Sequence, residues 1–209
     1  MASTIPLDQR CNLAVNRILE AANQVFGKKG LADATMSAIA FRAGISKQLV
    51  YHYYKNKEDL YCEVIQNRGK ELHAPYFKTH FDGMPPLAAL EAFFNVVMDT
   101  NLYGEEHFFT DQMLHSGDQM LRSKSMRPLG SQLVALLERL LTRAEAHGSI
   151  RTGVKAHLLL VQAALLASGY ASAKALMSRY LERDLETPDV TAEWRTHAVD
   201  SLMRTLAVN

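Results

Sequence analysis

A glycine between two short helical segments, within residues 35–60, limits the fold of this chain more than any other feature of the sequence. Thr35 can cap a helix that carries Ile39 inward, and Gly44 stands where a tight reversal needs a residue without a side chain. Ser46 can cap a second helix over residues 47–54, which is about two turns long. Two short helices joined by such a turn are typical of a helix-turn-helix DNA-binding motif.

The second of these helices predicts the DNA contacts. Val50 is expected to face the first helix, so most of the other side chains must lie on the remaining faces. The predicted contacts are Thr35, Ser37, Ser46, Lys47, Gln48, Leu49, Tyr51, His52, Tyr53 and Lys57. Glutamine can bind adenine through its donor and its acceptor, and lysine suits guanine or phosphate. The alternatives are packing in a small core for the aromatic residues, a solvated amide for Gln48 and simple capping for Thr35.

Charge supports the same interpretation. Residues 34–57 contain four Lys and Arg residues and no Asp or Glu. Residues 1–70 hold ten Lys and Arg against six Asp and Glu, whereas residues 71–209 hold thirteen against sixteen, although the net charge of the whole chain is only +1. A local basic surface is the electrostatic footprint of a protein that contacts phosphates. Asn56 can also cap a third helix, whose first-turn amides and Lys57 would hold a backbone phosphate.

These positions resemble a known family. The spaced residues Arg17, Ile18, Ala21, Ala22, Phe26, Gly30, Thr35, Ile39, Ala43, Gly44, Ile45, Ser46, Tyr51, Lys57, Glu58, Asp59 and Leu60 look like the DNA-binding domain of the TetR (tetracycline repressor-like) transcriptional regulators. The resemblance covers about the first third of the chain. Gln48 and Val50 depart from the usual pattern, so the preferred operator cannot be inferred from relatives. The resemblance implies a repressor that a small apolar or amphipathic effector releases from DNA.

The fold class is predicted to be all-α. No strand-like alternation, internal repeat or low-complexity segment is present. We expect a helix-turn-helix domain over residues 8–56, a connecting helix over 57–80, and an effector-binding and dimerisation domain over 81–209. The expected helices are 8–29, 57 to the break at Pro75 or beyond, 87–102, 105–115, 130–146, 155–181 and 191–208. The connecting helix would transmit motion between the two domains.

Composition excludes several classes of protein. The longest apolar run, residues 158–167, contains Gln162 and is far too short to span a membrane, and the N-terminus does not read as a secretion signal. We therefore expect a cytoplasmic protein. Cys11 and Cys62 have no paired spacing and are interpreted as free thiols. No cofactor is predicted, and no catalytic signature is present, which argues against an enzyme.

Apolar and small residues in the C-terminal region give two further predictions. Phe93, Phe94, Met98, Phe108, Phe109, Met113 and Tyr170 can line an effector cavity, the alternative being an ordinary core. Small residues on one of the last two helices and an apolar line on the other match the helices that form the four-helix dimer interface of TetR-like proteins. The residues predicted at this interface are Ala164, Ala167, Ser168, Ala171, Ala175, Trp194, Ala198 and Leu202.

Three polar residues in the same region leave a different ligand open. His107, Asp111 and His115 recur at intervals of four and would share one helical face, as metal ligands or as a polar stripe. The polar stripe is favoured, so no metal site is predicted. The sequence therefore predicts a homodimer that binds a double-stranded operator and a small effector. An effector-independent or architectural DNA-binding protein and a metal-responsive regulator stay as alternatives.

Overall fold

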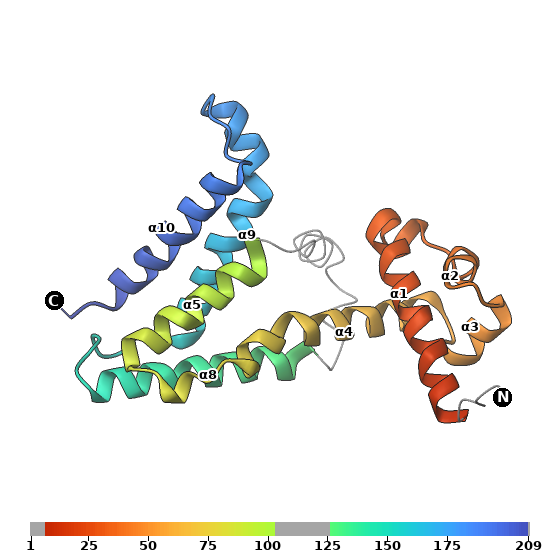
Figure 1. The fold of residues 1–209 in the computed structure, drawn as a ribbon, viewed down its shortest axis with the longest axis horizontal. Coiled ribbons are helices and arrows are strands. Elements are labelled where there is room, and N and C mark those ends of the chain that lie inside the picture. Colours follow the sequence, from red (N-terminus) through yellow and green to blue (C-terminus); the bar gives the residue numbers. More distant parts are fainter. Residues whose placement is uncertain (1–6, 103–125, 209) are drawn as a thin grey trace, which may run out of the picture. The chain divides into compact units, whose positions relative to one another are not determined.

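A computed structural model describes residues 7–102 and 126–208, and every regular element in those ranges is a helix (Figure 1). The predicted all-α class is confirmed. The elements are α1 (Leu7–Asp33), α2 (Met36–Ala43), α3 (Lys47–Tyr53), α4 (Lys57–Lys78), the short 3-10 turn η1 (Phe81–Gly83), α5 (Pro86–Leu102), α8 (Met126–Ala146), α9 (Ala156–Tyr180) and α10 (Pro188–Leu206).

The described residues form two compact units. The first contains the chain through Lys70, and the second contains the described residues from Glu71 onward. Helix α4 supplies residues to both units, since it begins at Lys57 and ends at Lys78. The first unit holds the predicted helix-turn-helix, and the second holds the larger core.

A small apolar core joins α1, α2 and α3. Its fully buried members include Ile18 and Ala22 from α1, Ile39 from α2 and Val50 from α3, and the inward positions of Ile39 and Val50 are as predicted. The beginning of α4 completes this core, because Tyr61 is buried and its ring meets Phe26 edge-on at 4.9 Å. Ile45, directly after the turn, is half-buried.

Helix α1 continues past Gly30, beyond the predicted range of residues 8–29. Gly30 has φ 69° and ψ 177°, which breaks the helical geometry, but the chain resumes a helical course to Asp33. The glycine therefore makes a kink. The residues beyond the kink, up to Asp33, are followed by Ala34, which is buried, and by Thr35, which begins α2.

The second unit is built around α5. Phe93, Phe94, Leu90 and Met98 on this helix have no exposed surface and pack in a core to which α8, α9 and α10 also contribute. At the edge of this core, the Arg195 guanidinium of α10 donates to both carboxylate oxygens of Asp99 on α5, at 2.6 and 2.9 Å.

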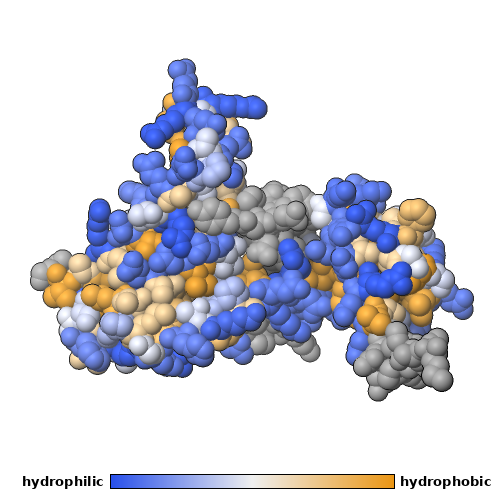
Figure 2. Space-filling view, in the orientation of Figure 1, coloured by the Kyte–Doolittle hydropathy of each residue, from blue (hydrophilic) through white to orange (hydrophobic). Residues whose placement is uncertain are grey.

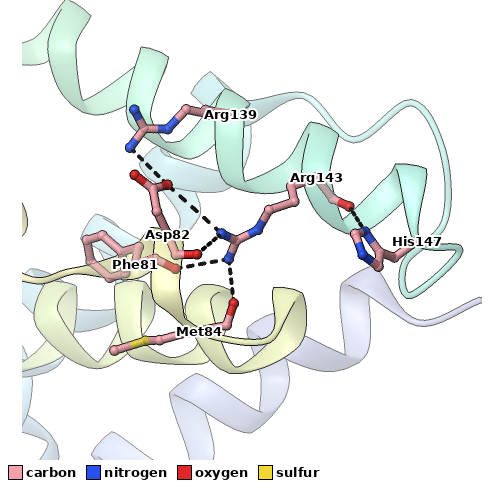
Figure 3. A network of polar contacts seen from close by, with 6 residues as sticks. All are labelled: Phe81, Asp82, Met84, Arg139, Arg143 and His147. Atoms are coloured by element: carbon pink, nitrogen blue, oxygen red, sulfur yellow. Dashed lines mark hydrogen bonds and ion pairs between the residues drawn. The ribbon is translucent and has the colours of Figure 1, made fainter.

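Arg143 on α8 fixes the turn that follows α4 (Figure 3). Its guanidinium donates to the carbonyls of Phe81, Asp82 and Met84 at 3.0 to 3.1 Å, and Arg139 lies 3.5 Å from the Asp82 carboxylate. One side chain thereby binds three carbonyls of the turn, including the Phe81 carbonyl, which also accepts from the Met84 amide. The turn between α4 and α5 is thus bonded to α8.

The last two helices form a hairpin whose limits differ from those predicted. Helix α10 begins at Pro188, three residues before the expected start, because Thr187 accepts a hydrogen bond from the Val190 amide and proline suits the first helical position.

Helix α8 begins at Met126 rather than near Gly130, with Pro128 in its first turn, where proline is tolerated.

Candidate DNA-binding surface

The reversal between α2 and α3 depends on Gly44. This residue has φ 63° and ψ 38°, a left-handed conformation that glycine adopts without steric cost. The Ile45 amide donates to the Ala40 carbonyl at 3.1 Å, which closes the end of α2. Arg17 on α1 then donates to the Ala43 carbonyl at 2.6 Å, so the turn is tied to the first helix as well.

Three side-chain caps set where the helices of this unit begin. The Thr35 hydroxyl accepts a hydrogen bond from the Ala38 amide at 3.2 Å, and the Ser46 hydroxyl accepts one from the Leu49 amide at 3.1 Å. The Asn56 side chain accepts one from the Asp59 amide at 2.7 Å. All three caps are as predicted. A two-turn helix such as α3 gains proportionally more from a cap than a long helix does, since few of its amides have intrahelical partners.

Helix α3 is divided into one buried side and one solvent-facing side. Val50 has no exposed surface and Tyr54, directly after the helix, is 5% exposed, whereas Tyr51 is 46% exposed. Gln48 and His52 are exposed as well. Packing therefore uses Val50 and Tyr54. It leaves the Gln48 amide and the His52 imidazole exposed, where they can meet a ligand.

Tyr54 strengthens the buried side of α3. Burial raises the pKa of its phenol above the ordinary value near 10, and the neighbouring Glu63 carboxylate, which accepts a hydrogen bond from the phenol, raises it further. The phenol therefore stays neutral at physiological pH. Its backbone amide also donates to the Val50 carbonyl at 2.9 Å, which closes the helix.

The exposed face of the motif carries the predicted DNA-contacting side chains. Thr35, Ser37, Ser46, Lys47, Gln48, Tyr51 and His52 are exposed, and Leu49, Tyr53 and Lys57 are partly exposed. The Lys47 ammonium lies 5.7 Å from the centre of the Tyr51 ring, and the His52 and Tyr53 rings meet edge-on at 5.2 Å. These contacts leave all four side chains at least partly exposed.

That surface keeps its positive charge. Within the described ranges, no ion pair forms with Lys47 or Lys55, and the Arg42 guanidinium donates to the Gln24 amide oxygen rather than to a carboxylate. A cation without an acidic partner is available for a phosphate. The charge asymmetry seen in the sequence is therefore not cancelled by the fold.

Lys57 has a structural contact that the sequence did not suggest. Its ammonium donates to the Ala32 carbonyl at 3.0 Å, near the end of α1. An ammonium has three donors, so one bond to a carbonyl leaves two for a phosphate. The contact places Lys57 beside the motif, but it also means that its removal would loosen the link between α1 and α4.

Arg17 and Gln24 are the residues that sequence reasoning missed here. Both lie on α1, yet both bond to the α2 segment or its turn. Arg17 was noted only as part of a resemblance. Arg17 lies beside the buried residues Ile18 and Ala21 of α1. This position at the edge of the buried face is the one signal in the sequence that could have indicated its contact with the turn.

Cys62 on α4 is a free thiol, as predicted. Burial raises the pKa of this thiol, and the nearby Asp59 and Glu58 carboxylates raise it further. The group therefore stays protonated and is a poor nucleophile.

The predicted effector residues fall in three places. Phe93, Phe94 and Met98 are fully buried members of the core, which is the alternative that the sequence left open. Tyr170 lines an apolar groove between α9 and α10. Phe108, Phe109 and Met113 lie outside the described residues, as do His107, Asp111 and His115, and the described part of the chain contains no cluster suited to a metal ion.

Four of the eight residues predicted at the dimer interface are buried within the chain itself. Ala167, Ala198 and Leu202 have no exposed surface because they pack in the core of their own chain, and Ala171 is 7% exposed. Trp194 is occupied within the hairpin, where it stacks on Tyr170 and donates to the Leu166 carbonyl. Ala164 and Ser168 are partly buried and Ala175 is exposed. Small side chains on α9 thus mainly allow close packing of the chain's own helices.

Two family models match the chain, one over each unit. The model described as bacterial regulatory proteins, tetR family, matches residues 18–64, and the model described as tetracyclin repressor-like, C-terminal domain, matches residues 86–202. The second match alone covers more than half of the chain. The chain belongs to the TetR family. This is the family indicated by the helix-turn-helix residues in the sequence.

Individual TetR-family proteins are similar over nearly the whole chain. The HTH-type transcriptional repressor NicS of Pseudomonas putida is 24% identical over 95% of this chain and 94% of its own length. A crystal structure of a putative TetR-family regulator from Mesorhizobium loti has a TM-score of 0.72 and 19% identity, with 95% and 99% of the two chains covered. The crystal structure of AibR in complex with isovaleryl coenzyme A and operator DNA has a TM-score of 0.65 and 16% identity, with 91% and 98% covered.

Membership in the TetR family makes this protein a DNA-binding transcriptional regulator rather than an enzyme. One described helix of this TetR-family chain, α9, is long and apolar enough by length and composition to cross a membrane. Its apolar character has another explanation in the fold. One side of α9 packs in the core, and another carries exposed apolar residues.

Proposed function

We propose that this TetR-family protein is a cytoplasmic homodimeric repressor that reads its operator with α3 and is released by a small amphipathic effector. The single observation that supports DNA reading best is the division of α3. Val50 and Tyr54 are buried, while Gln48, Tyr51 and His52 are exposed beside unpaired cations. A helix of two turns with this division can enter a major groove without unfolding any part of its unit.

The exposed groups divide into two roles. Gln48 and Lys47 lie in the first turn of α3, where side chains reach base edges, and Gln48 can bind adenine through both ends of its amide. Thr35, Ser37 and Lys57 lie at helix beginnings, where hydroxyls, amides and an ammonium suit phosphates. The first group would set sequence preference and the second would set affinity.

A homodimer gives two copies of α3 for the two halves of an operator. In place of the four predicted residues that are buried in the chain itself, we propose the exposed side of α9, here called the α9 stripe: the apolar residues Leu158, Val161, Leu165 and Leu176, with Ser172 between them. The four large members are 54 to 70% exposed in the single chain. A continuous row of this kind along one helix is rare on a monomer and suits a self-complementary interface.

Small-molecule control is supported by the family and by the size of the second unit. The solved AibR complex contains both isovaleryl coenzyme A and operator DNA, so one protein of this fold binds both kinds of ligand. In this chain α4 begins beside α3 and ends at the turn that Arg143 binds. A ligand that repacks the second unit would act on the motif through α4.

The decisive experiment is selection of DNA fragments by the purified protein, followed by measurement of affinity for the enriched site and for random DNA. Gln48→Ala should lower the ratio of the affinity for the enriched site to the affinity for random DNA by a factor that corresponds to about 1–3 kcal/mol. Gln132, an exposed residue of α8, provides the matched control as Gln132→Ala. Equal losses on both DNAs would remove Gln48 from the base-reading residues, and no enriched site at low salt would overturn the function.

The phosphate and dimer assignments have separate tests. Lys57→Ala should weaken binding to all sequences and lower the dependence of log affinity on log salt by about one. Val161→Glu in the α9 stripe should give a monomer in sedimentation, whereas Ala135→Glu, an exposed position on α8, should not. A dimer that survives Val161→Glu would place the interface elsewhere.

A further inference from the structure

A small pocket of about 300 Å³ lies between the last turn of α4, the η1 turn and the middle of α8. Tyr76, Phe77 and Phe81 contribute rings to its walls, and α8 contributes Leu136 and Arg139. The volume is at the lower end of the range for ligand pockets, so it suits a molecule of about one ring. None of the lining residues lies on α9 or α10, so the dimer interface proposed above does not account for this pocket.

Packing and hydrogen bonds hold the walls of this pocket in place. The Tyr76 and Phe81 rings are buried, and both pack on Phe93 of the core, with ring centres 5.5 and 6.0 Å from it. From α8, Arg143 binds the backbone carbonyls of η1 (Figure 3). A ligand would therefore find a preformed site and lose little affinity to ordering it.

The apolar side of the pocket is partly open to water. Phe77 is 51% exposed, although it carries a large apolar ring that borders the cavity, and Leu136 beside the same cavity is half-buried. Figure 2 shows a band of apolar residues between hydrophilic ones over the part of the second unit that α4, α5 and α8 form. A ligand that covered the Phe77 ring would remove apolar surface from water, which favours binding.

The charged groups at this pocket leave one positive charge in excess. The Asp82 carboxylate lies 3.5 Å from a terminal nitrogen of Arg139 and 3.9 Å from one of Arg143, so two guanidiniums share one carboxylate. The carbonyls of the turn occupy the Arg143 guanidinium, whereas Arg139 forms no hydrogen bond with any described residue. The planar fork of Arg139 is therefore available to a carboxylate, which it can bind through two parallel hydrogen bonds.

We infer that this pocket binds a small aromatic monocarboxylate, whose ring lies against Phe77 and Leu136 and whose carboxylate pairs with Arg139. A ligand in this position contacts α4 and α8 together, and so adds to the link that Arg143 already makes between α8 and the turn after α4. The inference goes beyond the proposed function and does not rest on it, because it concerns binding to residues of the second unit alone.

The probe is benzoate at pH 7, with benzamide as an uncharged molecule of nearly the same shape. Labelling only the eleven glycines with ¹⁵N gives few amide signals, and the signal of Gly83, which lines the pocket, is assigned by its loss in Gly83→Ala. A methyl group added there meets no atom within 4 Å, so this variant should fold normally.

Titration of the full-length protein with benzoate should shift the Gly83 signal to saturation with a Kd of about 0.1–1 mM, as expected for so small a ligand. The signal of Gly169 on α9 should stay unchanged. Benzamide should bind about tenfold more weakly, because it cannot form a charge-assisted pair with the guanidinium.

Two variants separate the charged end of the site from its apolar end. Arg139→Met should weaken benzoate binding about tenfold and leave benzamide binding unchanged, whereas Lys78→Met, at an exposed residue of α4 that does not line the pocket, should alter neither. Phe77→Ala should weaken both about fivefold, whereas Leu87→Ala, at an apolar residue of similar exposure on α5, should alter neither. Circular dichroism verifies that each variant is folded.

Any of four results would overturn the inference. They are no saturable shift of the Gly83 signal by about 10 mM benzoate, equal affinities for benzoate and benzamide, undiminished benzoate binding by Arg139→Met, and an equal loss in Lys78→Met, which would indicate a general effect of positive charge. A shift of the Gly169 signal without one of Gly83 would place the ligand on α9 and equally exclude this pocket. Failure of the protein to select any DNA site would count against the proposed function alone.

Discussion

The two units of this protein differ in the size of the core that each contains. The first unit has a small core, which includes Ile39, Val50 and Tyr54, while the groups suited to DNA stay outside. The second unit has a larger core around α5, with an apolar groove between α9 and α10. An exposed face can bind a ligand as large as a duplex, whereas a small effector must be surrounded.

The two units also use glycine and small residues differently. In the first unit Gly44 adopts a left-handed conformation, so its lack of a side chain is a requirement of the backbone. In the second unit Ala163, Ala167 and Ala198 are buried between helices, so their small size is a requirement of packing. A glycine therefore marks a turn in the first unit, and buried alanines mark close helix contact in the second.

The largest expected effect comes from removing a core ring of the second unit. Phe93→Ala should lower the free energy of unfolding by about 3–5 kcal/mol, because Phe93 is fully buried and meets Tyr76, Phe81 and Phe94. Urea unfolding followed by the Trp194 emission reports on this unit alone. Unchanged unfolding would show that the ring cluster contributes little.

Ile39→Ala provides the corresponding test of the first unit. The loss should be about 2–5 kcal/mol, since Ile39 is fully buried, and it should appear in the helical circular dichroism signal before the Trp194 emission changes. If the transition followed by circular dichroism separates from the one followed by Trp194 emission, the two units unfold independently. Coincident transitions in both variants would show that the protein unfolds as one cooperative structure.

Gly44→Ala should destabilise the first unit by about 1–2 kcal/mol, because a residue with a side chain is strained in the left-handed region. The added methyl group would also lie 2.9 Å from a terminal nitrogen of Arg17, which must move. Gly130→Ala is the control, since nothing lies within 4 Å of that position. Measurement of both melting temperature and DNA affinity would show whether the turn matters beyond stability; an unaltered melting temperature would contradict the strain.

Ser46→Ala removes the cap of α3 and should cost about 1 kcal/mol. Ser46→Asp separates capping from binding, because aspartate caps equally well but places a negative charge on the surface expected to meet phosphates. Chemical denaturation should therefore show restored stability in Ser46→Asp, while DNA binding stays impaired. Normal DNA binding by this variant would place Ser46 away from the duplex.

Alkaline pH should give the smallest effect. The raised pKa values of Tyr54 in the first unit and Tyr76 in the second mean that both phenols stay protonated when folded, whereas they ionise near pH 10 when unfolded. Stability is therefore unaffected below pH 10 and falls as the pH rises above it. Tyr54→Phe should reduce this fall when unfolding is measured at pH 7 and pH 11, and an identical fall would show that Tyr54 is not responsible.

The sequence by itself determined the helix-turn-helix, because its signals are local. Thr35, Ser46 and Asn56 cap helices within three residues of themselves, and Gly44 sets its own backbone angles, so neighbouring residues contain the whole argument. The expected exposure of Gln48 and His52 also followed from the 3.6-residue repeat within one helix. Gly30 was misjudged, since a glycine that ends a helix and one that bends it look alike until the next helix is placed.

Only the tertiary structure decided which side of each long helix faces the core. A helix such as α9, which is apolar on more than one side, has no unique buried face in its sequence, so Ala167 and Leu165 could not be told apart. Contacts across large separations, such as Arg17 to the Ala43 carbonyl and Tyr170 to Trp194, have no local signal at all. Helix formation depends on residues three and four apart, whereas burial and cavities depend on which helices meet.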